Sequence, residues 1–577
     1  MQNGSTNGAN GANGTNKGYS STAEASRIFD FLCGLFDDTD LPSSVQDFKE
    51  RLSFTATRDQ PYFPIPLKET ETTAALKAIE GAVACLLADL KTGKDEARHV
   101  TVNLEKTTAF LCQAYMAKIA GLGKLDPSVK KLLKDTDLLQ AQSNPYRRMS
   151  ANLYATKTPD EYYHIHGSLE ASTTLEMIGL ESHRPDLQTH EEIVGAIEPA
   201  VQKFTVEELE KMNAEKRQAG VPALKHEDFV QTPHGKTNMH IPPWSVDNLE
   251  DRTPKYPLPS ATAGQPVKPL EGIKVLELCR IIAGPTITRI LGEYGADVLK
   301  ITSPNLSDVP FFQVDGNMGK HAADLDLKTP QDRAVFDKLL AEADVLVDGY
   351  RPGALEKLGY GPKALARLAE ERGKGYVYVN ENCFGYEGEW ANRPGWQQIA
   401  DCVSGVAWEQ GRFMGLNEPV VPPFPISDYG TGCMGAITAL IGLYHRAVKG
   451  GSWHGKASLL QYDILLFKVG LLPKNVQEKL LEVMGPDFRA MRHAHSVDHI
   501  SGTALRKMRE LYPHLFDESR MLDHWWSEPY KAEVKAVLPV VEADNINSGF
   551  SRASRPNGSD APTWDFSGEK DRRISTP

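Results

Sequence analysis

The sequence has few cysteines, and none are arranged for cross-links or zinc binding. There are seven, an odd number, with no Cys-x-x-Cys pair among positions 33, 85, 112, 279, 383, 402 and 433. Neither a disulfide framework nor a zinc ribbon is expected, and a reducing compartment is favoured.

Long hydrophobic runs are also missing. No uninterrupted apolar stretch approaches the roughly 20 residues that a membrane-spanning helix needs. The first residues, Met-Gln-Asn-Gly-Ser-Thr-Asn-Gly, lack the apolar core of a signal peptide, and the final Arg-Ile-Ser-Thr-Pro does not match the peroxisomal tripeptide. We therefore expect a cytoplasmic protein without a membrane partner.

Positive charge is in the minority. The chain has 64 Lys and Arg against 76 Asp and Glu, a net charge of −12. A broad nucleic-acid-binding surface would need clustered Lys and Arg, so none is expected. The length of 577 residues allows roughly two to four domains, and small-molecule chemistry is the favoured class of function.

Composition divides the chain into five segments. Residues 1–22 are rich in Asn, Gly, Ser and Thr, and they cannot bury enough apolar surface to offset the entropy of ordering. Residues 241–268 hold too many prolines for a helix or a central strand. The expected order is a disordered tail (1–22), a degenerate N-terminal half with a small domain (23–240), a Pro-rich linker (241–268), a catalytic domain (269–470), and a helical segment with a polar, surface-wrapped or loose tail (471–577).

After the Pro-rich stretch, short apolar segments alternate with helical patterns. This alternation predicts a doubly wound α/β domain with a parallel sheet, whose ligands bind at the carboxyl ends of the strands. The first turn, Arg280-Ile-Ile-Ala-Gly-Pro-Thr, lacks Gly-x-Gly-x-x-Gly, which disfavours an NAD or FAD site. The predicted strands are Ile273–Cys279, Asp297–Ile301, Asp344–Asp348 and Tyr376–Asn380, and the predicted helices span 286–294 and 330–342.

One phrase occurs twice, as Phe63-Pro-Ile-Pro-Leu67 and as Phe424-Pro-Ile-Ser-Asp428. Each copy is followed by a small-residue helical stretch, a turn containing Lys and Gly, and a short apolar segment. Chance similarity between amphipathic helices is the alternative, but the shared order and spacing favour an internal duplication. Because Leu67 stands opposite Asp428, the first copy is expected to be catalytically empty.

Four phrases resemble the class III CoA-transferase family, which includes formyl-CoA transferase, the carnitine CoA-transferases and the α-methylacyl-CoA racemases. The resemblance implies a doubly wound, mainly parallel, Rossmann-like CoA-binding domain with a smaller α+β domain, in a duplicated member of fungal type. Parts of the N-terminal half resemble the family's small domain, which suggests two truncated copies in one chain. The phrases are Pro269-Leu-Glu-Gly-Ile-Lys-Val-Leu-Glu-Leu with Ala283-Gly-Pro and Gly295-Ala-Asp-Val-Leu-Lys-Ile, Asp324-Leu-Asp-Leu-Lys-Thr-Pro, Ala343-Asp-Val-Leu-Val-Asp-Gly-Tyr-Arg-Pro-Gly, and Arg393-Pro-Gly-Trp with Val403-Ser-Gly.

The resemblance implies an enzyme that transfers CoA from an acyl-CoA to a carboxylic acid through a covalent aspartyl intermediate. By this resemblance Asp428 is the nucleophile, although an ordinary helix cap would also place an Asp there. A helix beginning at this point would favour the ionised carboxylate. Gly430, Gly432 and Gly435 would let the thioester approach the backbone.

By the same resemblance CoA is a substrate rather than a tightly bound cofactor, and no metal is needed. Lys328 and Lys357 would pair with its phosphates, and Tyr350 would pack on adenine; a purely local structural role is the alternative for each. Thr302-Ser303-Pro304 replaces the family's Glu and nearby phosphate-binding Arg, so one CoA contact is missing or relocated. The implied CoA-binding residues are Ile282, Ala283, Leu325, Lys328, Gly349, Tyr350, Arg351 and Lys357.

Two other functions stay open at this stage. A racemase needs a His where this chain has Trp396-Gln397, and a non-catalytic CoA-binding protein would fit the altered phosphate residues. The remaining histidines, among them His164, His166 and His493, are expected to be surface or packing residues. Acyl-CoA and a carboxylic acid are the expected partners, with no nucleic acid, and a homodimer is possible.

Overall fold

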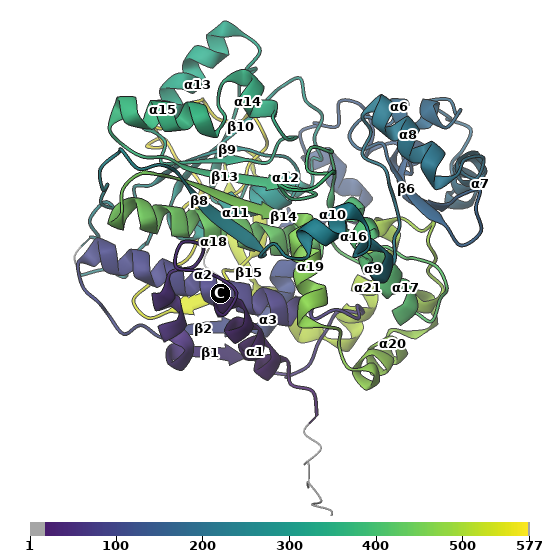
Figure 1. The fold of residues 1–577 in the computed structure, drawn as a ribbon, viewed down its shortest axis with the longest axis horizontal. Helices are drawn as coiled ribbons and strands as arrows, with labels where there is room; N and C mark the ends of the chain where they lie inside the picture. The colour runs from purple at the N-terminus through teal and green to yellow at the C-terminus, as the bar shows by residue number, and fades with distance from the viewer. Residues whose placement is uncertain (1–17, 263, 575–577) are drawn as a thin grey trace, which may run out of the picture.

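The computed structural model describes residues 18–262 and 264–574 (Figure 1). The disordered tail expected at residues 1–22 therefore lies mostly outside the described residues. Its last residues already form a helix, because α1 (Ser21–Cys33) begins after Ser20, whose side chain accepts the N–H of Ala23. In the described part of the chain, no helix is both long and apolar enough to cross a membrane.

A seven-stranded sheet forms the centre of the C-terminal half. Its order is β11-β10-β9-β12-β13-β14-β8, and all pairs are parallel except β14 with β8. Helices cover both faces, as the near-continuous apolar strands require, so the predicted doubly wound sheet is confirmed. The strands are β8 (Trp244–Glu250), β9 (Lys274–Leu278), β10 (Asp297–Thr302), β11 (Lys320–Asp324), β12 (Val345–Asp348), β13 (Val377–Asn382) and β14 (Ser452–Ser458).

Strand β8 lies inside the stretch that was expected to be a linker. Its backbone pairs with β14, and the indole of Trp244 donates a hydrogen bond of 2.9 Å to the Asp40 carbonyl. Prolines flank β8 but do not interrupt it, so the segment can serve as an edge strand. Only the later part of residues 241–268 is a connection.

The helices form layers above and below this sheet (Figure 1). One face is covered by α13 (Pro330–Glu342), α14 (Ala354–Leu358) and α15 (Pro362–Arg372). The other face is covered by α11 (Ala283–Glu293) and α18 (Ile426–Val448), and α2 (Glu69–Thr92) packs along α18. Beyond α2 lies a three-stranded sheet of β1 (Leu52–Thr55), β2 (Val100–Asn103) and β17 (Val541–Ala543).

The two segments with the repeated phrase lie side by side and share one order of elements. In the first, α2 leads to β2 and then to α3 (Leu104–Leu111); in the second, α18 leads to β14 and then to α19 (Leu459–Val469). In both, the strand has a parallel neighbour on one side and an antiparallel neighbour on the other. The rings of Phe63 and Phe424, which begin the two phrases, lie 5.6 Å apart.

A small α+β unit comes from the N-terminal half and is seen beside the main sheet in Figure 1. Its sheet contains β5 (Ala151–Ala155), β6 (Tyr162–His166) and β7 (Val221–Pro222), with α6 (Ser172–Met177), α7 (His190–Val201) and α8 (Val206–Lys216) around it. The remaining short α-helices are α4 (Gln113–Met116), α5 (Pro145–Arg148), α9 (His226–Phe229), α10 (Pro233–Asn238), α12 (Phe312–Gly316), α16 (Gln397–Ser404), α17 (Val406–Phe413) and α22 (Glu518–Met521).

The C-terminal segment is integrated into the fold. After α20 (Lys474–Arg489) and α21 (Val497–Leu511), the hairpin of β15 (Leu522–Ser527) and β16 (Ala532–Val537) pairs through β16 with β3 (Lys118–Ile119). The same five-stranded sheet includes β4 (Leu122–Gly123) and β18 (Arg572–Arg573).

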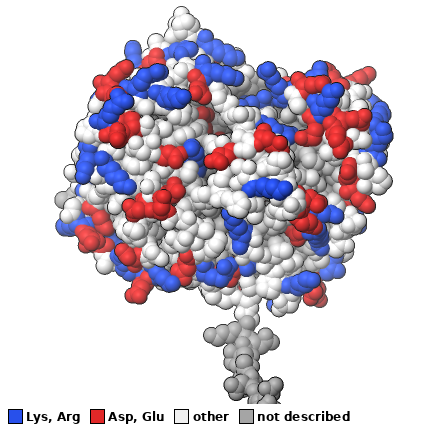
Figure 2. Space-filling model, in the orientation of Figure 1, with Lys and Arg blue, Asp and Glu red and all other residues white. Residues whose placement is uncertain are grey.

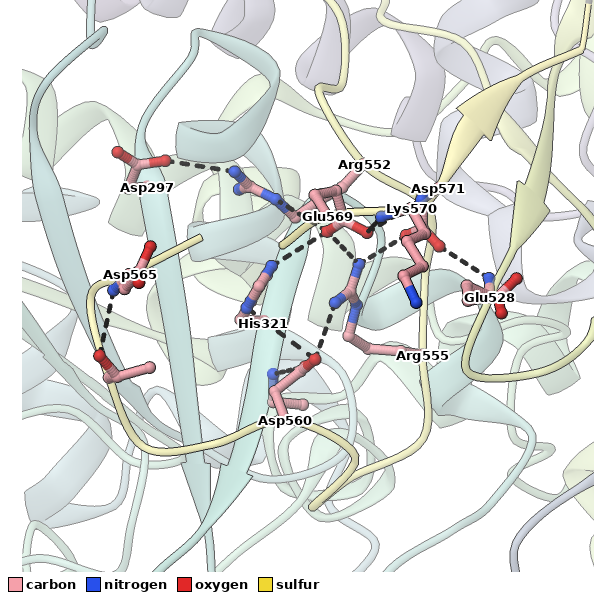
Figure 3. Close-up of polar contacts among 12 residues, drawn as sticks. Asp297, His321, Glu528, Arg552, Arg555, Asp560, Asp565, Glu569, Lys570 and Asp571 are labelled. Carbon is pink, nitrogen blue, oxygen red and sulfur yellow. Dashed lines mark hydrogen bonds and ion pairs between the residues drawn. The ribbon is translucent and has the colours of Figure 1, made fainter. Parts of the chain in front are cut away.

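The polar tail is not loose either. Residues 552–571 lie along the edge strand β11, where Asp560 and Ala322 exchange hydrogen bonds of 2.7 and 2.9 Å (Figure 3). Arg555, 2% exposed, pairs with Asp560 at 2.9 Å, Glu569 at 2.7 Å and Asp571 at 2.5 Å. Of the two predicted arrangements the tail is surface-wrapped, since ion pairs and edge bonding hold the segment and cover an open sheet edge.

Charges of both signs are interspersed on the face shown in Figure 2. No extended basic area is visible on that face, which agrees with the negative net charge.

Candidate active site

Asp428 lies in the first turn of α18, between two cavities. The larger cavity has a volume of 650 Å³ and the smaller one 270 Å³, and Asp428 lines both. His166, Ser168 and Trp396 also line both, so they surround the junction. The carboxyl group of Asp428 therefore has space on two sides.

The smaller cavity lies at the carboxyl ends of the parallel strands, the edge at which ligands bind in such sheets. Of the implied CoA-binding residues, Ala283, Gly349, Tyr350 and Arg351 line it, whereas Ile282 lines the larger cavity. The structure thus brings five of these eight positions to Asp428.

The other three implied positions are not among the lining residues of either cavity. Leu325 is 5% exposed and packs in the apolar core beneath α13. Lys328 and Lys357 are exposed on the surface. Their roles toward CoA stay predictions.

Arg280 was missed by the sequence analysis. It lines the smaller cavity and an adjoining third cavity of 110 Å³, and its Nη2 atom is buried without a hydrogen-bond partner. Desolvation, and then the charge of Arg280, lower the pKa of Arg351. Neither guanidinium has an ion-pair partner among residues 18–262 and 264–574, so the two form a candidate anion-binding pair. The sequence feature that could have identified Arg280 is its position directly after the first predicted strand, Ile273–Cys279.

The carboxyl group of Asp428 is harder to ionise than an ordinary aspartate. Burial raises its pKa well above the usual value, and the charges of Glu381 and Asp463 raise it further. The helix N-terminus was expected to favour ionisation, but that effect is worth only about 0.3–1 kcal/mol. Desolvation and two like charges outweigh it, so the pKa of Asp428 is raised overall.

A second acidic group shares the smaller cavity. Glu381 lies near the end of β13. Burial, and then the charge of Asp348, raise its pKa to about 8. The Glu381 carboxyl lies close to Gly349, since a Cβ added to Gly349 would lie 3.3 Å from Glu381 Oε2. The cavity therefore contains two carboxyl groups as well as two guanidinium groups.

A network of buried carboxyl groups lies behind Asp428. The Ser427 hydroxyl is 3.0 Å from Asp401 and 2.8 Å from Asp463. One hydroxyl carries one proton, so it donates to only one of them, and the other contact requires a protonated carboxyl that donates to Ser427. Burial raises the pKa of Asp463 to about 7, and burial followed by the charge of Asp463 raises the pKa of Asp401. The network joins α16, α18 and α19 behind Asp428.

The glycines after Asp428 serve helix packing. A Cβ on Gly430 would overlap the Tyr462 ring, and one on Gly432 would lie 2.5 Å from Thr286 Cγ2. A Cβ on Gly435 would overlap the side chain of Ile287 in α11. The expectation that these glycines admit the thioester is therefore wrong, because protein side chains already fill that space.

His166 is buried beside the site, with its ring centroid 5.8 Å from that of Trp396. Burial lowers its pKa well below the usual value, so the imidazole is neutral, and its Nδ1 has no partner in the described structure. Trp396 and Gln397, where a racemase would carry its His, line the larger cavity. Within residues 18–262 and 264–574, no group of three or more His, Cys, Asp and Glu could hold a metal ion.

Comparison with known proteins identifies the family of this chain. Residues 270–482 match the model of CoA-transferase family III. The chain is 31% identical over 537 residues to the acetyl-coenzyme A transferase nodX of Hypoxylon pulicicidum, which covers 91% of this chain and 90% of that protein. It is 32% identical over 499 residues to an acyl-CoA transferase of Gibberella moniliformis, covering 84% and 86%.

Among solved structures, a CAIB/BAIF family protein from Brucella suis is 28% identical, with a TM-score of 0.30, and covers 35% of this chain and 55% of that one. The similarity to the Hypoxylon protein extends over most of both sequences. The chain therefore belongs to CoA-transferase family III and is an enzyme that acts as a CoA-transferase.

Proposed function

We propose that this enzyme transfers CoA from an acyl-CoA thioester to a carboxylic acid, with Asp428 as the covalent nucleophile. The observation that carries the proposal is that Asp428 lines both cavities. One cavity can hold the CoA portion while the acids enter and leave through the other.

The reaction proceeds by alternating anhydrides and thioesters. The Asp428 carboxylate attacks the thioester carbonyl, and CoA leaves as a thiolate, which forms a mixed anhydride. The thiolate then attacks the aspartyl carbonyl of the anhydride, which releases the first acid as a carboxylate and leaves CoA on Asp428. The second acid reverses these steps: its carboxylate displaces CoA, and the thiolate attacks the new acyl carbonyl and frees Asp428.

The residues of the smaller cavity suit the CoA portion. Arg280 and Arg351 offer unpaired positive charge for its phosphates, which compensates for the phosphate-binding Arg that is absent after the second strand. Tyr350 lines both this cavity and the adjoining third cavity, where an adenine ring can pack.

The neighbouring carboxyl groups set the state of the nucleophile. A raised pKa makes the ionised Asp428 a stronger nucleophile but lowers its ionised fraction at neutral pH. Protonation within the Asp401–Ser427–Asp463 network limits that cost, because it removes one negative charge from the vicinity.

We also propose that the two halves are truncated copies of one ancestral module. The shared order of α2-β2-α3 and α18-β14-α19 supports this, as does the matching of strand directions around β2 and β14. Co-expression of residues 1–260 with 261–577 should restore activity that neither fragment has alone. Two inert fragments that do not associate would count against it.

The test of the mechanism is to trap the intermediate. The protein is incubated with acyl-CoA, treated with hydroxylamine and analysed by peptide mass spectrometry, and we expect a hydroxamate at Asp428. Asp428→Asn should give no adduct, whereas Glu381→Gln, a carboxyl change in the same smaller cavity, should retain it. An unmodified Asp428 during measurable transfer would refute covalent catalysis.

Proton exchange at the α-carbon is not favoured as the main activity, because the relatives named above are transferases. Incubation in heavy water tests it directly. Deuterium incorporation without CoA transfer would support a racemase, and neither reaction in a protein that binds acyl-CoA would support a CoA-binding protein.

A further inference from the structure

The larger cavity has mostly apolar walls. Its volume of 650 Å³ is that of a pocket for a drug-sized ligand. Pockets of this size bind through apolar area, with a few polar groups at the reacting end. The apolar walls are formed by Leu125, Val129 and Leu133 on one side and by Val309, Phe311 and Phe312 on the other.

One wall is a fixed segment of the N-terminal half, residues 124–139, which we name the wall segment. Its end is held by Asp137, whose carboxylate accepts the N–H groups of Ala141, Gln142 and Ser143 at 3.0, 2.9 and 2.7 Å. The Thr136 carbonyl accepts the Asp308 N–H at 2.7 Å. The wall segment lies outside the part of the chain that matches the family model, residues 270–482.

Exposed apolar side chains gather where the cavities open. Nine large apolar side chains are exposed among the described residues, and four of them line a cavity: Leu125 lines the larger cavity, whereas Leu138, Leu139 and Leu306 line the smaller or the third cavity. Exposed apolar clusters mark binding surfaces more often than chance scatter does. The four are Leu125 at 47%, Leu138 at 52%, Leu139 at 45% and Leu306 at 41% exposed.

The cations deeper in the larger cavity are already engaged. Lys124 forms an ion pair with Asp498, and Arg148 lies 3.7 Å from the same carboxylate. The other two lining lysines, Lys130 and Lys134, are exposed. Inside this cavity a second carboxylate on a substrate would therefore compete with Asp498 for Lys124 and Arg148, and the exposed Lys130 would compensate little of its desolvation.

We propose that the larger cavity selects a bulky, apolar monocarboxylic acid, whose carboxyl group reaches Asp428 and whose hydrocarbon portion packs against the wall segment. This inference rests on the proposed function, since it assumes that the acyl group occupies the larger cavity while CoA occupies the smaller one. Small acids and dicarboxylic acids are poor substrates because they leave apolar surface unfilled or bury a second charge.

The test uses CoA thioethers, which bind but cannot react. Calorimetry with the full-length wild-type protein compares S-ethyl-CoA, S-butyl-CoA, S-decyl-CoA and S-(3-carboxypropyl)-CoA. Each fully buried methylene can tighten binding about threefold to fourfold, so S-decyl-CoA should bind at least about 100-fold more tightly than S-ethyl-CoA. The carboxypropyl compound should bind about tenfold more weakly than S-butyl-CoA.

A cavity-filling variant tests whether the alkyl chain of the CoA thioether lies in the larger cavity. Leu133→Trp should reduce the advantage of S-decyl-CoA over S-ethyl-CoA at least about tenfold. Leu35→Trp is the matched control, because Leu35 is 38% exposed and lines neither cavity. If Leu133→Trp does not fold, the wild-type series still decides the inference.

The outcomes separate the two proposals. Equal affinity for S-ethyl-CoA and S-decyl-CoA, or a preference for the carboxypropyl compound, would overturn the substrate class while leaving aspartyl catalysis intact. Strong chain-length dependence without any hydroxamate at Asp428 would retain the cavity assignment and refute the covalent mechanism.

Discussion

Arg555 gives the sharpest test of how the polar tail is held. Its side chain is 2% exposed, and Arg555→Ala would leave the carboxylates of Asp560, Glu569 and Asp571 without their shared cation (Figure 3). Breaking a buried ion pair costs about 3–5 kcal/mol. Because His321 still contacts Glu569 at 3.0 Å, we take the lower limit of about 3 kcal/mol.

The assay is hydrogen exchange of the Ala322 amide, which donates to the Asp560 carboxylate at 2.7 Å. Exchange through local opening of the tail reports the free energy of that opening. A loss of about 3 kcal/mol corresponds to exchange about 100-fold faster. Arg555→Met should give a similar increase, because it keeps most of the side-chain volume and removes the charge.

Arg573→Ala is the control, since Arg573 is 63% exposed and pairs with Asp523 at 2.6 Å. An exposed pair contributes about 1 kcal/mol or less, so Ala322 exchange should change less than about fivefold. The reasoning is refuted if Arg555→Ala leaves the Ala322 amide protected, or if both variants have equal effects.

The tail should also loosen in acid. Burial raises the pKa of Glu569, but its hydrogen bond with His321 and the charge of Arg555 more than offset burial and hold the pKa below 4.5. A depressed carboxyl pKa contributes stability that is present above about pH 4.5 and is lost as the pH falls through the folded value. Ala322 exchange should therefore accelerate below this pH beyond its intrinsic pH dependence.

Four further predictions address the site and its frame. Glu381→Gln removes a like charge, so the pKa of Asp428 should fall and the acidic limb of the kcat/KM profile should move to lower pH; an unmoved limb would contradict this. Arg280→Ala should raise KM for acyl-CoA about tenfold with little change in kcat, and a kcat effect alone would argue against phosphate binding. Burial lowers the pKa of His493, but its two glutamate partners raise it to about 9. The stabilisation from the charged His493 is therefore present below about pH 6.5 and lost as the pH rises through 9. The Tm difference between the wild type and His493→Gln should shrink between about pH 6 and about pH 10, and a constant difference would refute a charged His493. Gly432→Val should cost about 2 kcal/mol by overlap with α11, measured by denaturant unfolding, and a neutral result would show that α18 can shift.

Local patterns predicted four of the seven strands of the central sheet, because these four contain short runs of Val, Ile, Leu and Tyr; β11 and β14 were not among the predicted strands. Ile273–Cys279 was predicted and β9 spans Lys274–Leu278, and the other predicted strands agree similarly. Strand β8 was missed because flanking prolines masked a proline-free segment. Of the two predicted arrangements of the tail, surface-wrapped or loose, composition could not choose, because the hydrogen bond that joins Asp560 to β11 connects residues hundreds of positions apart.

The site was predictable where a phrase is contiguous in sequence, and less so where packing creates it. Asp428 and the loop at 349–351 meet at the smaller cavity. Asp401 and Asp463 come together only because α16 and α19 pack beside α18, and His493 meets Glu198 from α7 at 2.6 Å across the fold. The raised pKa of Asp428 also depends on Glu381, which no local sequence motif connects with Asp428.

The larger cavity draws its walls from both halves of one polypeptide. A covalent connection keeps those walls at a fixed effective concentration, so this shared cavity does not depend on an encounter between separate molecules. A substitution in either half therefore acts on a cavity that both halves share. Because one gene encodes both walls, a mutation in the wall segment can change substrate preference without a compensating mutation in a second gene.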